Sequence, residues 1–395
     1  MIKPHIIIPN LIEQPTWGGS YIAKTKKIKD PAIAKKKIGQ SYELYQNTNL
    51  SRKRSTESLP SLELGNPTDP TQAKLISKND KPTSINLLMK KDAEAVLGAK
   101  ALKVHGRKMN ILIKFTQAKG NSYQIHVKKN QKDPKWQAKP ESWYYFEQGQ
   151  VTLGVKPGID WEKYEQTCKR INQKAMEISH RIKSGELKVK DGRNELREVI
   201  KANNPEQCVH VIKIKKDQAI NLSSGGAHHS WEENPSYAPN GNIVYEVQRN
   251  VFDPVSTIRS FDKGNIKGDG SIRKIHINDY FKYIDRSPRA NDPNTHFRSG
   301  RALMRSSGAL VKQIFKTPGY SLQELTITQP FNNEFTRTEG SFHHLFVRAG
   351  NLLLLAGNDS WIITQGYSVF IPQATKQYTA KPYKCKQATI LKTYL

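Results

Sequence analysis

Cysteines are few in this 395-residue chain, and no hydrophobic run is long enough to cross a membrane. The three cysteines, Cys168, Cys208 and Cys385, are odd in number and far apart. Their spacing argues against a disulfide framework or a zinc finger and favours a reducing compartment, the cytoplasm. The best membrane candidate, LLLLAG at 352–357, is far shorter than the roughly 20 residues that a spanning helix needs. The first ten residues carry one lysine and end with Pro9 and Asn10, so we expect no secretory signal.

Acidic residues are also scarce: 35 of them face 63 lysines and arginines, which gives a net charge of +28. One explanation is nucleic-acid binding, and the other is a lysine-rich surface without a specific partner. No RNP-like aromatic strand, zinc finger or basic zipper accompanies the charge. We therefore expect no nucleic-acid partner, although the positive field would attract a phosphorylated substrate. The nucleic-acid alternative predicts binding that weakens steeply with salt.

Alternating hydrophobicity and turn signals predict strands over most of the chain. Glycine-led segments at 16–23 and 39–45 are strand-like, and the segments 110–117 and 122–127 form two strands around the turn AKGN. Further strands are expected at 143–155, 209–216, 220–224 and 242–250, and from about 308 onward at intervals of about ten residues.

Helical periodicity is confined to a few segments. Apolar residues recur at steps of three and four between 161 and 184, and Gly185 ends this amphipathic helix. A second helix is predicted over 194–202, and a short one over 93–102. The sequence therefore predicts a mainly β protein with two β-barrel regions, the first of them split by a helical insertion. We divide it into residues 1–160 and 206–295 for the catalytic barrel, 161–205 for the insertion and 296–395 for the C-terminal barrel.

The segment SYQIHV places Ser122, Gln124 and His126 on one face of a strand, because side chains alternate along it. Glu141 follows in KPESWYYFE and His228 in SSGGAHHSW. Imidazole nitrogens with carboxylate and amide oxygens are ligands for a borderline divalent ion such as zinc. Each residue taken alone also has an ordinary explanation. His126 is explained equally by a structural histidine and Glu141 by a surface carboxylate. Of the adjacent pair His228 and His229, either one is a candidate for the ligand.

An ordered series of six motifs resembles the type I phosphomannose isomerases of the cupin superfamily. The matching segments are EQPTWGG, IGQSYEL, MNILIKFTQAKGNSYQIHV, AKPESWYYFE, GGAHHSW and EVQRNVFDPVSTIRSFD, spread over about residues 9–278. The resemblance implies two cupin-type jelly-roll barrels and reversible isomerisation of mannose 6-phosphate and fructose 6-phosphate through a cis-enediol. It implies one zinc ion per chain and a small sugar phosphate as partner. We expect a cytoplasmic enzyme without membrane contact; a monomer is favoured, and the sequence leaves the oligomeric state open.

The same resemblance assigns roles to individual residues. The zinc ligands would be Gln124, His126, Glu141 and His228. Lys139 would be the active-site lysine and Arg259 the essential arginine. Ser122, with Lys263 four residues after Arg259, would contact the substrate phosphate.

Several positions depart from the family pattern. Val127 stands where the family has proline, Tyr42 and Gln40 replace tryptophan and glutamate, and the connection 230–242 is longer than usual. These departures leave two alternatives open: a cupin that binds a sugar phosphate without turnover, or an isomerase of the same fold for another phosphorylated sugar.

Overall fold

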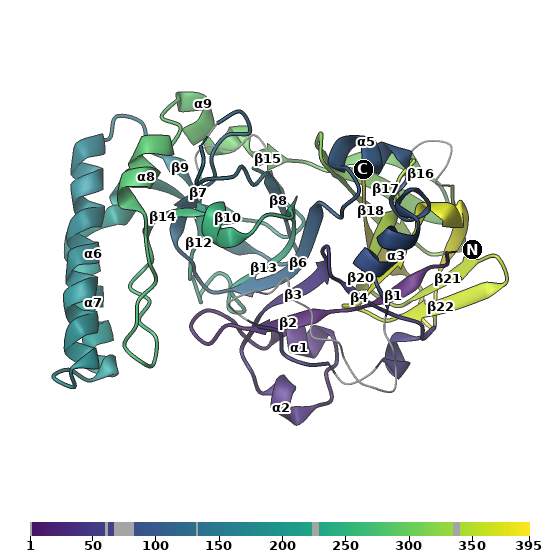
Figure 1. The fold of residues 1–395 in the computed structure, drawn as a ribbon, viewed down its shortest axis with the longest axis horizontal. Helices are drawn as coiled ribbons and strands as arrows, with labels where there is room; N and C mark the ends of the chain where they lie inside the picture. Colours follow the sequence, from purple (N-terminus) through teal and green to yellow (C-terminus); the bar gives the residue numbers. More distant parts are fainter. Residues whose placement is uncertain (1, 60–61, 67–82, 132, 223–228, 335–339) are drawn as a thin grey trace. The chain divides into compact units, whose positions relative to one another are not determined.

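The computed structural model describes residues 2–59, 62–66, 83–131, 133–222, 229–334 and 340–395 (Figure 1). Strands dominate this part of the chain, as the sequence predicted. None of its helices is long and apolar enough to cross a membrane. The chain forms two compact units: unit 1 contains residues 1–117, 244–250 and 298–395, and unit 2 contains residues 118–243 and 251–297.

Unit 1 is built on a nine-stranded antiparallel sheet. In spatial order its strands are β16 (Arg301–Arg305), β17 (Ala309–Lys316), β18 (Ser321–Ile327), β25 (Ala388–Tyr394), β20 (His343–Ala349), β23 (Ser368–Ile371), β1 (His5–Ile8), β4 (Asn49–Ser51) and β5 (Thr83–Ser84). Because β1 pairs with both β4 and β23, the two ends of the sequence share one sheet. The division of the sequence into residues 1–160 with 206–295, 161–205 and 296–395 stays a prediction.

A second, four-stranded antiparallel sheet of unit 1 has the order β19 (Phe331–Glu334), β24 (Gln377–Pro382), β21 (Leu352–Ala356) and β22 (Asp359–Ile363). Leu352, Leu354, Trp361 and Ile363 alternate with more exposed residues and are buried. This period of two is what made the strands near the C-terminus predictable. Unit 1 also contains the ladder of β2 (Asn10–Glu13), β3 (Ile38–Leu44) and β6 (Ile111–Ala118), and most of β13 (Asn242–Arg249).

Unit 2 contains the strands that carry the predicted site. One antiparallel pair joins β7 (Tyr123–Ile125) to β14 (Ile258–Phe261), and another joins β8 (Glu141–Tyr145) to β11 (Ala219–Asn221). A three-stranded sheet has the order β10 (Val209–Ile214), β9 (Gly149–Val155) and β12 (His229–Trp231). The short strand β15 (Phe297–Arg298) follows at the boundary with unit 1. Among the described residues no sheet closes into a barrel, so the two jelly-roll barrels remain a proposal.

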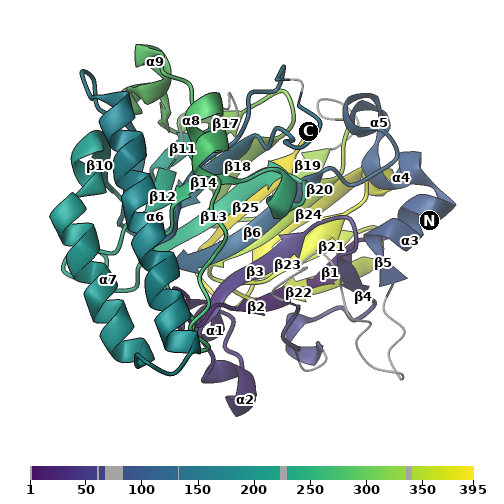
Figure 2. The same ribbon diagram turned by 60° about the vertical axis from the view of Figure 1, so that its left-hand side comes forward.

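The long helices of unit 2 are α6 (Trp161–Lys183) and α7 (Val189–Asn203), which lie side by side in Figures 1 and 2. The Asp160 carboxylate caps α6 by accepting a hydrogen bond from the Lys163 backbone N–H at 3.0 Å. The apolar stripe of α6 packs on a core that includes residues of β7 and β14. The sequence therefore placed α6 correctly, and α7 begins five residues before the predicted start at 194.

The other helices are short: α1 (Tyr21–Thr25), α2 (Pro31–Ala34), α3 (Ile85–Lys91), α4 (Ala93–Leu97), α5 (Ala99–His105), α8 (Ile277–Tyr283) and α9 (Pro288–Asn291). Three of them, α1, α4 and α5, correct the sequence analysis at two places. The strand expected at 16–23 is wrong, because residues from Tyr21 onward form α1. The single helix expected at 93–102 is divided into α4 and α5 at Gly98, whose φ of 88° is incompatible with a continuing helix.

Adjacent histidines of β20 occupy different environments in unit 1. His343 Nδ1 lies 2.9 Å from the Tyr378 hydroxyl, whereas His344 Nδ1 lies 3.1 Å from the Tyr245 hydroxyl. Because side chains alternate along a strand, the two histidines project from opposite faces of β20. Burial, helped by the positive charge of Lys26, lowers the pKa of His344 to about 3.

The buried His344 predicts a loss of stability in acid. Between pH 6.5 and 3, His344 is protonated in the unfolded chain but neutral in the folded one. The free energy of unfolding therefore falls as the pH falls. The contribution is at most about 1.4 kcal/mol per pH unit. His344→Asn should reduce this slope in urea unfolding measured between pH 7 and 4. His180→Asn, at an exposed position of α6, should not, and equal slopes in wild type and His344→Asn would contradict the prediction.

Candidate functional site

The β7–β14 pair brings the predicted metal-binding face and the predicted arginine together. Arg259 lies directly opposite Gln124 in this antiparallel ladder. Paired residues of adjacent strands project from the same face, so both side chains lie on the side that also carries Ser122 and His126. The other face of β7 presents Tyr123 and Ile125 to the hydrophobic core under α6. Core burial on one face therefore fixes which side chains line the site on the other.

His126 is held in one orientation by the backbone of a neighbouring loop. Its Nδ1 lies 2.6 Å from the Ser256 carbonyl oxygen, and only 2% of the residue is exposed. A carbonyl can only accept, so Nδ1 carries the proton and Nε2 keeps its lone pair. This is the arrangement by which an outer hydrogen bond orients a metal-binding histidine. Burial, with the nearby charge of Lys139, lowers the pKa of His126, which keeps the ring neutral at pH 7.

Glu141 begins β8 and faces His126. Its Oε2 lies 3.3 Å from His126 Nε2, and the residue is 1% exposed. A lone pair and a carboxylate oxygen at this distance repel each other unless a cation lies between them or is bound by both. The donor set of imidazole nitrogen, carboxylate oxygen and the nearby Gln124 amide therefore fits a divalent metal ion.

Lys139 and Arg259 place two positive charges in unit 2 near these groups. Lys139 Nζ lies 3.4 Å from Glu141 Oε2 and 3.0 Å from Asp253 Oδ1. Burial lowers the pKa of Arg259 to about 10, so it stays charged at neutral pH. Arg259 Nη1 reaches only the Thr257 carbonyl, at 3.4 Å, and its buried Nε has no hydrogen-bond partner among the described residues. A guanidinium in that state can accept an anionic group without first breaking an ion pair.

The two predicted phosphate-binding residues lie in different surroundings. Ser122 is buried, and its hydroxyl donates to Gln124 Oε1 at 3.3 Å. Lys263 is ion-paired with Glu232 and lies over the ring of Tyr123, on the core side of β7. The structure therefore brings Ser122 to the metal-binding face but does not bring Lys263 there.

The fourth predicted ligand, His228, lies outside the described residues. In the described part of the chain, no three His, Cys, Asp or Glu side chains form a cluster that could hold a metal. Sequence reasoning missed Asp253, which binds Lys139, and Ser256, which orients His126. Both belong to the motif EVQRNVFDPVSTIRSFD, whose polar residues beside Arg259 were the available signal.

Comparison with known proteins finds structures of similar fold but no protein that matches in sequence. No family model and no curated protein matches the sequence. Among solved structures, mannose 6-phosphate isomerase from Bacillus subtilis is similar over 100% of both chains, with a TM-score of 0.67 and 15% identity. A mutant phosphomannose isomerase from Salmonella typhimurium matches over 100% of this chain and 99% of its own, with a TM-score of 0.65 and 13% identity. A zinc-bound mannose 6-phosphate isomerase matches over 99% of both chains, with a TM-score of 0.64 and 12% identity.

These similarities define the class of fold. The chain is similar in fold, over its full length, to solved structures of isomerases. More particularly, it has the fold seen in phosphomannose isomerases, zinc-bound ones among them.

Proposed function

We propose that this protein is a metal-dependent aldose–ketose isomerase that interconverts mannose 6-phosphate and fructose 6-phosphate. The observation that carries the proposal is the His126–Glu141 pair, with Nε2 and Oε2 at 3.3 Å on the face shared by Gln124 and Arg259. The end-to-end likeness to mannose 6-phosphate isomerases supports the choice of substrate. In this proposal the strands of both halves form cupin-type barrels, and the protein is a cytoplasmic monomer.

Gln124, His126, Glu141 and His228 would hold one zinc ion. When bound, zinc would supply Lewis-acid polarisation of the sugar oxygens at C1 and C2. The Ser256 carbonyl would keep His126 Nε2 directed at the metal position. In the absence of substrate, the Ser122 hydroxyl would hold the Gln124 amide side chain in place through its hydrogen bond to Oε1.

Arg259 and Lys139 would stabilise the negative charge that develops when a proton leaves C2 of the aldose or C1 of the ketose. Both are cationic and largely buried, and charge stabilisation is strongest where water is excluded. Asp253 would position Lys139 by its 3.0 Å contact with Nζ. Ser122 would turn from Gln124 to the substrate phosphate, whereas Lys263 could reach a phosphate only by leaving Glu232.

The proposal is tested by removing and restoring the metal. Chelator-treated protein should lose the conversion of mannose 6-phosphate to fructose 6-phosphate, and one equivalent of zinc per chain should restore it, measured in a coupled assay. Activity that persists in fully stripped protein would contradict the metal requirement. Tight binding of one zinc without turnover of this substrate would contradict the assigned reaction and favour a binding-only cupin or another sugar phosphate.

A further inference from the structure

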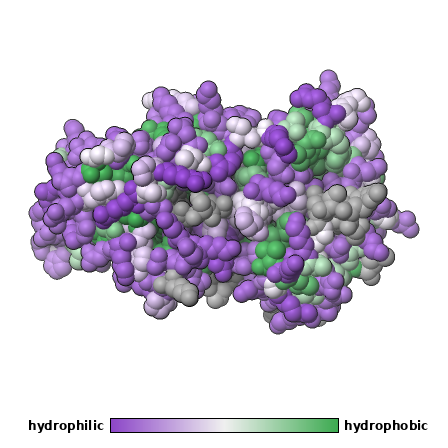
Figure 3. All heavy atoms as spheres, turned by 90° about the horizontal axis from the view of Figure 1, so that it is seen from above, coloured by the Kyte–Doolittle hydropathy of each residue, from purple (hydrophilic) through white to green (hydrophobic). Residues whose placement is uncertain are grey.

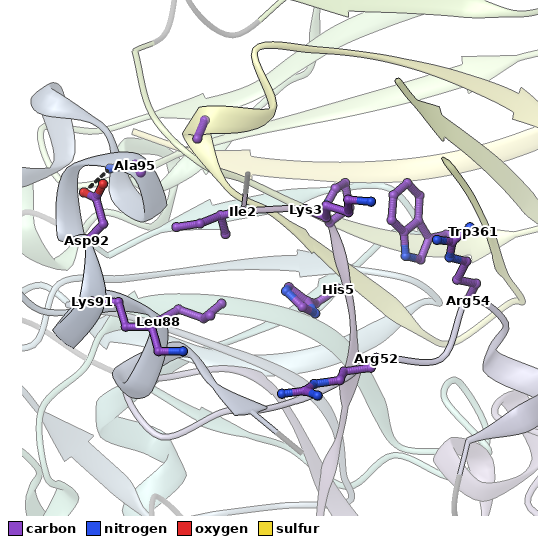
Figure 4. A pocket seen from close by; sticks show the side chains of 12 residues that line it. Ile2, Lys3, His5, Arg52, Arg54, Leu88, Lys91, Asp92, Ala95 and Trp361 are labelled. Atoms are coloured by element: carbon purple, nitrogen blue, oxygen red, sulfur yellow. Dashed lines mark hydrogen bonds between the residues drawn. The ribbon is translucent and has the colours of Figure 1, made fainter. Parts of the chain in front are cut away.

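A cleft of about 670 Å³ opens in unit 1 and contains none of the candidate-site residues. Figure 4 shows its walls, which come from the start of β1, the segment after β4, the helices α3 and α4, and Trp361 of β22. Its volume falls within the range of roughly 300–1,000 Å³ that is usual for small-molecule sites. Unit 1 therefore has room for a ligand of its own.

Positive charge is in excess around this cleft. Lys3, Arg52, Arg54 and Lys91 line it, whereas Asp92 is the only carboxylate among the lining residues. Lys3 and Arg54 are both bound to Asp359, at 2.5 Å and 2.6 Å. Two lining cations are thereby neutralised in part, and the charge of the other two stays available.

Arg52 and Lys91 are the cations that an incoming anion would meet. In the part of the chain that the structure describes, neither forms an ion pair with a carboxylate. The Asp92 carboxylate, next to Lys91 in the sequence, is engaged instead with the Ala95 backbone N–H at 2.9 Å, where it caps α4. In the view of Figure 4, Arg52 and Lys91 come from opposite sides of the cleft, and their charged ends point into the space below His5.

His5 also lines the cleft. Its Nδ1 lies 3.4 Å from the Ser51 carbonyl oxygen. Burial, followed by the charge of the adjacent Arg52, lowers the pKa of His5. An anion bound beside Arg52 would favour the protonated form of His5, which donates a hydrogen bond from Nε2.

Apolar side chains also line the cleft. Leu88 and Ala95 come from consecutive helices, and Trp361 lies beside Arg54, whose guanidinium carbon is 5.9 Å from the ring centroid. Inorganic phosphate would use only the cationic end of this cleft. A ligand with several negative charges and a ring would use both ends.

We propose that this cleft binds a nucleoside diphosphate, with the phosphates among Arg52, Lys91 and His5 and the nucleoside against the apolar wall. This site is separate from the proposed isomerase residues, and its occupancy does not depend on the proposed reaction. The proposed site would account for part of the net charge of +28. The face in Figure 3 is mostly hydrophilic.

The test is calorimetric titration of the full chain with ADP, GDP and UDP. The double variant Arg52→Ala, Lys91→Ala should bind at least about tenfold more weakly than wild type, because two charge-assisted hydrogen-bonding partners are lost. The matched control is Lys53→Ala, Lys90→Ala, which removes the same charge at exposed neighbouring positions that do not line the cleft. The control should bind within about twofold of wild type, because those two side chains do not line the cleft and leave only a screened long-range charge effect.

The proposal is overturned if none of the three nucleotides binds the wild-type chain. It is also overturned if the two double variants weaken binding equally, which would mean general electrostatic attraction, or if the cleft variant binds as tightly as wild type, which would place the ligand elsewhere. Circular dichroism of each variant checks folding. None of these outcomes depends on isomerase activity, so this proposal and the proposed function can fail independently.

Discussion

Glu141→Ala is expected to abolish metal binding and to lower kcat/KM for mannose 6-phosphate by about a thousandfold or more. The carboxylate supplies an anionic oxygen 3.3 Å from His126 Nε2, and no other described acidic side chain lies against that nitrogen in an ion pair. Its loss leaves the site without a negative charge to balance a divalent cation. His126→Ala should have a similar effect, because it removes the nitrogen ligand and its link to the Ser256 carbonyl.

Metal content measured by atomic absorption and activity measured on the same preparation distinguish this role from a structural one. Glu141→Gln keeps the shape of the side chain, so it should fold like wild type, yet it should still lose metal. Glu177→Ala is the matched control, since Glu177 is an exposed carboxylate of the same unit, paired with Lys174 on α6. Full activity and one zinc per chain in Glu141→Ala would refute the assignment.

Glu43→Ala is expected to destabilise unit 1 by about 3–5 kcal/mol, because it leaves a buried ammonium without its counter-charge. Lys26 Nζ lies 2.7 Å from Glu43 Oε1, and both side chains are 0% exposed. Ser41 and Ser368 also donate to the Glu43 carboxylate, at 2.6 Å and 2.8 Å. For a unit of this size the loss corresponds to a fall in Tm of roughly 10 °C, measured by calorimetry or urea unfolding.

Removing both charges together should cost much less. The double variant Lys26→Met, Glu43→Leu fills similar volume without burying an unpaired ion, so it should recover most of the stability lost in Glu43→Ala. Breaking the exposed Lys174–Glu177 pair by Glu177→Ala should change stability by less than about 1 kcal/mol. A Glu43→Ala variant as stable as that control would show that the buried pair contributes nothing.

Local patterns predicted the elements whose faces differ in burial. The stripe at steps of three and four gave α6, and alternation gave the strands around Gln124 and those near the C-terminus. The failures lie where local preference was weak. Tyr21–Thr25 became a helix although the glycines before it suggested a strand, and Gly98 divided one predicted helix into two.

In the candidate site, too, the sequence predicted some features and missed others. Alternation along SYQIHV placed Ser122, Gln124 and His126 on one face before any contact was known. It could not supply Asp253 for Lys139 or the Ser256 carbonyl for His126, because these contacts join residues more than one hundred positions apart. Nor could it show that Lys263 pairs with Glu232, since many lysines offered equivalent candidates.

The sequence by itself determined that this is a mainly β protein with a two-helix segment and a set of metal-binding residue types on one strand face. Hydrophobic periodicity and residue type depend only on residues that are close together in the sequence, so both can be recognised without the structure. Tertiary structure alone decided that the two ends of the chain share one sheet, that Lys26 and Glu43 are buried together, and that unit 1 holds a cationic cleft. These features depend on which strands pair, and pairing is chosen by burial summed over the whole chain rather than by any one segment.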